Sequence, residues 1–298
     1  MFVYLVLILK RGGLGLKMWI LAAVLTMLCL GTNNLILKAT SGKGLSKIHM
    51  QFYFYLTAFL LTLGYGLVQG FEMFTLLTFV LGSLVGILNA NANIQMTKAF
   101  EKGPASITAP LISTNTVIPV LSAALLFHEH ITLIQWIGII VMLASGAVIQ
   151  YVPGKNGRDI EIDYKPWMLH VLIAFFSLGI LGVLMKTSTH LQLDTVNMLI
   201  SMYGGGALYL LINSFITKEN WLPTELKIGA FMGCINLVGY ISYFFALNTG
   251  FASIVFPIVS LSALVVVIGS CWLYKERLKV YQIIGIFTAL LGIVLTKI

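Results

Sequence analysis

The sequence predicts an all-α integral membrane protein of ten transmembrane helices, arranged as two inverted repeats of five helices. Three observations predict this class. Hydrophobic residues make up 59% and charged residues 9% of the 298 positions, which is more apolar surface than a soluble core of this length buries. Apolar stretches of roughly 20 residues, the length that a helix needs to cross a bilayer, recur along the chain. The second half of the sequence also repeats the first.

The repeat includes small and polar residues, which apolar composition alone does not align. Positions 147 apart carry the same residue at many sites, among them Gly82 with Gly229, Asn89 with Asn236, Pro110 with Pro257, and Glu129 with Glu276. Nearer the start the best offset is 148, which pairs Lys38 with Lys186. The chain is therefore a duplication of one half. Because each half has an odd number of helices, the second enters the membrane from the opposite side, a plan common among secondary transporters.

The expected helices are joined by short loops. They span residues 18–37, 49–69, 74–97, 104–127, 132–151, 166–186, 195–216, 226–247, 251–273 and 280–297. Residues 1–17 form an N-terminal stub, and a polar linker over 152–165 joins a first repeat of 18–151 to a second of 166–298. With this assignment thirteen Lys and Arg residues lie on the side of the linker and five on the side of the termini. The positive-inside tendency therefore places both termini outside the cytoplasm.

Lys38 and Lys186 close the first and sixth expected helices. Their stems can snorkel to the headgroups, or their ammonium groups form a cation pair at the cavity mouths that favours an anionic solute. Asn33 of the first helix is a further binding candidate, because a polar side chain at bilayer depth needs a partner. Tyr53, Tyr55 and Tyr203 are candidates as well, although aromatic residues near helix ends more often belong to the interfacial belt.

The third and eighth expected helices carry matching polar side chains. Asn89 and Asn93 are four residues apart on one face of the third helix, and Asn236, Tyr240 and Tyr243 follow at spacings of four and three in the eighth. We expect these two helices to line two walls of one central cavity, which is the favoured substrate site. The alternative is interhelical hydrogen bonding that only holds the bundle together.

Pro110 and Pro257 precede hydroxyl and amide side chains in the fourth and ninth expected helices. These side chains are Ser113, Asn115 and Ser260. Proline leaves a backbone carbonyl without its usual donor, so the neighbouring side chains either repair the helix or line an aqueous path.

Glu129 and Glu276 lie just before the fifth and tenth expected helices, where we expect each carboxylate to cap the positive end of the helix dipole, with a proton relay as the alternative role. All ten acidic residues fall in loops or at helix ends, so no carboxylate is expected at mid-membrane. That pattern disfavours proton-coupled export of lipophilic cations. No nucleotide-binding loop, metal-ligand cluster or catalytic arrangement is recognisable, so we expect no cofactor, no metal and no enzyme activity.

Two stretches of the first half have counterparts in the second half. AFEKGPASITAP and FHEHITLIQWIGIIVMLASG correspond to ALNTGFASIVFP and LYKERLKVYQIIGIFTALLG. This pattern, a small-residue turn into a helix followed by a glutamate and a glycine-rich last helix, resembles the EamA-type permeases of the drug/metabolite transporter superfamily. The resemblance covers Met18 to Ile298 and implies ten helices with cytoplasmic termini, opposite to the orientation that the charge distribution favours. The family includes amino-acid exporters and carriers of sugars and nucleotide sugars, so the resemblance does not identify the substrate.

These features predict a secondary-active permease of the cytoplasmic membrane that moves a small polar or zwitterionic metabolite by alternating access, with export suggested by the resemblance. The alternatives are an uptake carrier for a sugar or nucleoside-type solute, or a non-transporting membrane subunit. The net charge of +8 is dispersed over helix ends, so the expected partners are the lipid bilayer and a small-molecule solute, and not nucleic acid. A monomer is expected, because two halves already enclose one pathway.

Overall fold

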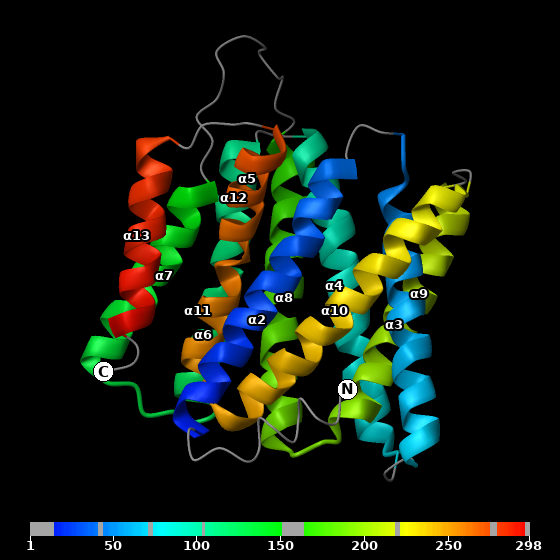
Figure 1. Cartoon of the computed structure of the whole chain (residues 1–298), viewed down its shortest axis with the longest axis horizontal. Coiled ribbons are helices and arrows are strands. Elements are labelled where there is room, and N and C mark those ends of the chain that lie inside the picture. Colours follow the sequence, from blue (N-terminus) through cyan, green and yellow to red (C-terminus); the bar gives the residue numbers. More distant parts are fainter. Residues whose placement is uncertain are drawn as a thin grey trace.

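The computed structural model describes residues 15–40, 44–70, 74–102, 105–150, 164–217, 221–274 and 279–295, and every regular element within these ranges is a helix (Figure 1). Most of the N-terminal stub and of the linker over 152–165 lies outside the described residues, as does Glu276. The first half contains α2 (Gly15–Thr40), α3 (Lys47–Gln69), α4 (Leu76–Lys102), α5 (Ala105–Ser113), α6 (Val117–Leu125) and α7 (Leu133–Gln150). The second half contains α8 (Tyr164–His190), α9 (Thr195–Thr217), α10 (Pro223–Thr249), α11 (Ala252–Ser260), α12 (Ser262–Tyr274) and α13 (Val280–Leu295).

Corresponding helices of the two halves run in opposite directions. In Figure 1, α2 rises from the bottom of the view to the top, whereas its counterpart α8 descends. The packing follows the same exchange, because α4 lies against α8 and α9, and α10 lies against α2 and α3. Each half thus packs its third helix on the first two helices of the other half. We call the end of the bundle where α2 and α11 begin the proximal end, and the end where α3 and α10 begin the distal end.

Much of the chain is suited to a bilayer. Seven described stretches are long and apolar enough to cross a membrane, namely those in α2, α3, α4, α8, α9 and α10 and the stretch Ala252–Gly269. Shorter apolar helices cover Leu111–Leu125, Leu133–Ile149 and Val280–Leu295. Large apolar side chains such as Phe231 and Phe287 are 61% and 69% exposed, as expected for a surface that faces lipid. The protein is therefore an all-helical, multi-pass membrane protein, and the number of ten crossings stays a prediction.

Two of the expected helices are broken. The sequence predicts membrane-crossing helices over 104–127 and 251–273, and the structure shows a local break within each stretch. A 3₁₀ turn at Thr114–Thr116 separates α5 from α6, and Leu261 separates α11 from α12. Pro257 lies inside α11, where it removes a backbone donor, and side chains just beyond it bond back to the carbonyls of their own helix.

Glycines let helices of opposite halves pack at backbone distance. Gly229 of α10 lies against α3, where an added Cβ would be 2.6 Å from the carbonyl oxygen of Met50. Gly86 of α4 lies against α9, where an added Cβ would overlap the carbonyl group of Met202. Under the repeat α3 corresponds to α9, and α10 corresponds to α4. A close contact between the second helix of one half and the third helix of the other therefore forms twice.

Candidate functional site at the centre of the bundle

Six neutral polar residues meet where α3, α4, α9 and α10 come together. We call them the central cluster, which consists of Tyr55 of α3, Asn89 of α4, Tyr203 of α9, and Asn236, Tyr240 and Tyr243 of α10. Tyr55 and Tyr203 have no exposed surface, and the three residues of α10 are at most 6% exposed. Two of the four helices come from each half, so the central cluster lies between the halves.

Two hydrogen bonds and a row of aromatic rings hold the central cluster. The Nδ2 atom of Asn89 donates to Oη of Tyr240 at 2.9 Å, and Oη of Tyr203 donates to Oδ1 of Asn236 at 2.9 Å. Neighbouring ring centroids lie 5.8 to 6.1 Å apart in the order Tyr55, Tyr203, Tyr240, Tyr243 and Phe256 of α11. These separations suit edge-on and tilted aromatic contacts, which stabilise the packing beyond simple burial.

Local sequence explains how the side chains reach one another. On α10 the spacings of four and three place Asn236, Tyr240 and Tyr243 on one helix face. On the other side Gly206 of α9 makes room for Tyr55, since an added Cβ at Gly206 would overlap the Tyr55 ring. The packing of the Tyr55 ring against α9 therefore depends on the missing side chain of Gly206.

The structure brings together four of the residues predicted to line one site: Asn89, Asn236, Tyr240 and Tyr243. Asn93 lies one turn further along α4 and is partly buried. Tyr55 and Tyr203 join the same cluster, so the sequence-based preference for an interfacial belt is wrong for both. Their full burial follows from helix packing across the halves, which the sequence does not display.

Asn33 occupies a buried position on α2. Its side chain is 5% exposed, and neither amide atom has a hydrogen-bond partner among the described residues. It lies one turn beyond Cys29, whose Cβ packs on Gly239 of α10. Asn33 therefore lies on the side of α2 that faces α10, and burial of an unpaired amide costs about 1–3 kcal/mol.

The polar residues of the two broken helices bond locally. Nδ2 of Asn115 donates to the carbonyl of Ile112 at 2.6 Å, and Oγ of Ser260 donates to the carbonyl of Pro257 at 2.7 Å. Ser113 ends α5 and is partly buried. The bonds of Asn115 and Ser260 satisfy carbonyls at the breaks, which is the repair that the sequence offered as one of two roles.

Lys38 and Lys186 lie at opposite ends of the bundle, because α2 and α8 run in opposite directions. Lys38 is exposed in the last turn of α2, at the distal end. Lys186 lies one turn before the end of α8, since this helix continues to His190, and its ammonium nitrogen is 3.0 Å from Oε1 of Glu129. In this conformation the charge of Lys186 is therefore paired with a carboxylate of the same chain.

A second polar network crosses α4, α8 and α9 on the other face of α4. Asn91 Oδ1 accepts hydrogen bonds from Tyr209 at 2.9 Å and from Gln95 at 3.2 Å. Gln95 Oε1 in turn lies 2.6 Å from Nδ1 of His170, and Asn91 Nδ2 donates to Ser177 at 3.4 Å. The polar residues of α4 thus divide between two faces, and Asn89 is the one that reaches the central cluster.

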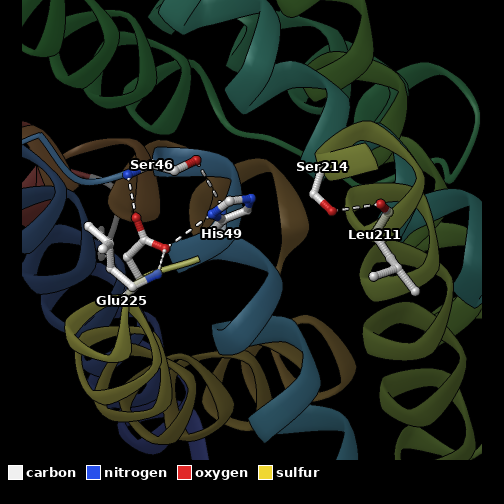
Figure 2. A network of polar contacts seen from close by, with 6 residues as sticks. Ser46, His49, Leu211, Ser214 and Glu225 are labelled. Carbon is white, nitrogen blue, oxygen red and sulfur yellow. Dashed lines mark hydrogen bonds and ion pairs between the residues drawn. The ribbon is translucent and has the colours of Figure 1, made fainter. Parts of the chain in front are cut away.

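Glu225 and His49 form an enclosed pair at the distal end (Figure 2). Glu225 stands at the start of α10, as the sequence indicates, but its side chain is only 1% exposed. Its oxygens accept the backbone amides of Ser46 at 2.7 Å and Leu222 at 3.1 Å, and Oε2 lies 3.1 Å from Nδ1 of His49. Trp221 stacks on the imidazole with 3.8 Å between ring centroids. One buried carboxylate therefore serves the first turns of both α3 and α10.

Among the described residues no group of three or more His, Cys, Asp or Glu side chains is arranged to hold a metal.

Comparison with known proteins settles the family. The sequence model of the EamA-like transporter family matches residues 17–151 and matches again over residues 165–298. The chain belongs to the EamA-like transporter family. Among curated proteins, none matches this EamA protein. One solved structure, described only as a crystal structure of a protein, superimposes with a TM-score of 0.76 over 93% of this chain and 97% of that chain, at 14% sequence identity. That likeness concerns the fold alone.

Proposed function

We propose that this EamA protein is a secondary-active permease with ten crossings of the cytoplasmic membrane, which exports a small polar or zwitterionic metabolite through the central cluster by alternating access. The observation that carries the proposal is the composition and position of that cluster. It is neutral, it is rich in hydrogen-bonding groups, and both halves contribute to it.

The chemistry of the central cluster favours a solute without net charge. Amide and phenol groups supply donors and acceptors, but they supply no countercharge, and burial of an uncompensated ion in a low-dielectric interior is costly. A zwitterion fits such a site, because the tyrosine rings attract an ammonium group and the amide and hydroxyl donors bind a carboxylate. Asn33, whose buried amide has no partner among the described residues, offers a further polar contact on the side of α2.

The way the two halves interlock supports alternating access. The hydrogen bond from Asn89 to Tyr240 joins the third helices of the two halves, and inverted halves can exchange conformations so that a central site opens to one face and then to the other. A solute that binds between Asn89 and Tyr240 would replace this bond by bonds to itself.

The test is reconstitution into liposomes with a pooled, isotopically labelled metabolite extract, followed by identification of the solutes that cross. Wild-type protein is expected to move at least one small polar or zwitterionic solute. Asn89→Ala and Asn236→Ala are expected to abolish that flux while the protein remains folded and in the membrane. The matched control is Asn248→Ala, an exposed amide on the same helix as Asn236, which should retain flux. Unchanged flux in both cluster variants, or no flux of any solute by the wild type, would contradict the proposal.

A further inference from the structure

Glu129, in the loop after α6, joins the first half to the second at the proximal end. Its carboxylate accepts the backbone amide of Ala252 at 2.9 Å and both the amide and the hydroxyl of Ser253 at 3.0 and 2.8 Å. The same carboxylate lies 3.0 Å from Nζ of Lys186. We call Glu129, Lys186, Ala252 and Ser253 the Glu129 lock.

The partner of this carboxylate differs from the sequence-based expectation. The sequence places Glu129 before the helix over 132–151 and predicts that it caps that helix. In the structure Thr132 and Gln135 cap α7 instead, each accepting the backbone amide of the other at 3.3 and 3.0 Å. Glu129 is thereby left to cap α11, a helix of the other half.

The surroundings of the Glu129 lock hold the carboxylate in its charged form. Burial raises the pKa of Glu129, but the amide of Ser253 and the ammonium of Lys186 outweigh burial, and the net result is a pKa below the ordinary value. The side chains of Lys186 and Glu129 are 13% and 9% exposed, so solvent screens this ion pair little. Lys186 Nζ also lies 5.9 Å from the ring centroid of Phe127.

The backbone beside the Glu129 lock is turned into an uncommon conformation. His128 has a φ of 52°, in the left-handed region that non-glycine residues seldom adopt. The turn lets the amide of Glu129 bond the carbonyl of Ala123 at 3.1 Å. A left-handed residue of this kind commonly ends a helix, and here it places Glu129 just beyond the end of α6.

From these contacts we infer that the Glu129 lock is the proximal gate of the permease: it closes this end of the central pathway when formed, and it must break for that end to open. The inference rests on the proposed function. The lock is suited to this role because its charged hydrogen bonds are made only between the two halves. A relative movement of the halves therefore breaks all of them together, whereas contacts within one half are unaffected.

The repeat supplies a matched control. The sequence carries Glu276 at the position equivalent to Glu129, and Lys38 at the position equivalent to Lys186. Glu276 lies outside the described residues, and Lys38 lies at the distal end. Glu276→Gln therefore removes the same charge from the other half and leaves the four residues of the Glu129 lock unchanged.

The experiment measures access to a thiol in the middle of the bundle. The reporter is Ser260→Cys in a protein whose Cys29, Cys234 and Cys271 are replaced by alanine. Ser260 lies one turn beyond Phe256, whose ring contacts Tyr243, so the reporter lies on the central face of α11. A membrane-impermeant maleimide is applied to vesicles that hold the protein in either orientation. Leu191→Cys, at an exposed position of the proximal end, identifies the vesicles that present this end outwards.

Glu129→Gln and, as a second variant, Lys186→Gln are each expected to raise the rate of reporter labelling from the proximal face by about 5-fold or more, the size of a typical coupling between two states. Neither variant should raise labelling from the distal face, and Glu276→Gln should not raise it from the proximal face. Unchanged proximal labelling in both variants would overturn the inference. An equal rise from both faces would overturn it too, because it would indicate a general loosening of the fold.

This labelling requires no solute. If the reconstituted wild type moves no solute but the proximal labelling still responds to the two substitutions, the permease proposal fails and the lock remains a gate between two conformations. If solute moves and the labelling does not respond, the inference about the gate fails alone.

Discussion

Asn89 of α4 donates a hydrogen bond to Tyr240 of α10 at 2.9 Å, although 151 positions separate the two residues in the chain. Each belongs to the third helix of its half, and both lie in the central cluster. The pair therefore joins the two halves at the position where we propose that solute binds.

Tyr240→Phe is expected to reduce solute flux in liposomes by about 10-fold or more, because it leaves the Asn89 amide without its partner and removes a hydrogen-bonding group from the site, a cost of about 1–3 kcal/mol. The matched control is Tyr209→Phe, whose lost hydroxyl bonds Asn91 outside the central cluster. Flux of the solute identified with the wild type is the measurement for both. Equal losses in the two variants would show that the tyrosine hydroxyls act only in bundle packing.

Glu225→Ala is expected to lower the melting temperature of the purified protein strongly, because it leaves the backbone amides of Ser46 and Leu222 without their acceptor and removes the partner of buried His49. Breaking a buried pair of this kind costs about 3–5 kcal/mol. Asp194→Ala is the comparison, since Asp194 caps α9 by accepting the amide of Asn197 at 2.8 Å. Loss of that single cap costs about 1 kcal/mol. Thermal unfolding followed by intrinsic fluorescence measures both, and a larger loss in the Asp194 variant would contradict the double capping role.

Gly229→Ala is expected to destabilise the protein by about 1–3 kcal/mol, because the new Cβ would lie 2.6 Å from the backbone carbonyl of Met50 and α3 would have to move. Gly64→Ala is the control, since an added Cβ there meets nothing within 4 Å. In a helix interior that change is neutral or stabilises by up to about 1 kcal/mol. The melting temperatures of the two variants should therefore shift in different directions, and similar shifts would argue against close packing of α3 on α10.

The stability difference between wild type and Glu129→Gln is expected to depend on pH. The pKa of Glu129 is lowered in the folded protein, so its carboxylate contributes stability that is fully present above the unfolded pKa, about 4.3, and is lost as pH falls through the folded pKa. Melting temperatures of both proteins, compared at neutral pH and in steps below about pH 5, should converge as the solution becomes acidic. A difference in melting temperature that grows as the pH falls would contradict a stabilising, charged Glu129.

Much of the central cluster could be predicted, because helical periodicity and duplication act together. The spacing of Asn236, Tyr240 and Tyr243 places them on one face, and the equivalence of Asn89 and Asn236 places both on third helices that meet between the halves. Tyr55 could not be recognised in this way, since its burial depends on the space left by Gly206, a residue of another helix.

The capping contacts show the limit most clearly. A glutamate before a helix indicates a cap, yet Glu129 serves a helix whose first residue lies 123 positions away, because Thr132 and Gln135 already occupy the nearer one. Glu225 could be placed at a helix end from the sequence, but its nearly complete burial depends on α3 and on Trp221 covering it.

The sequence by itself determined that this protein is a duplicated, all-helical membrane protein of the EamA-like transporter family, because hydrophobicity, residue spacing and internal repetition are properties of the chain alone. The tertiary structure decided which side chains meet: the six residues of the central cluster, the paired charge of Lys186 and the burial of Glu225. The physical reason is that periodicity fixes the face on which a residue lies, whereas its partner is fixed by the packing of helices from the opposite half.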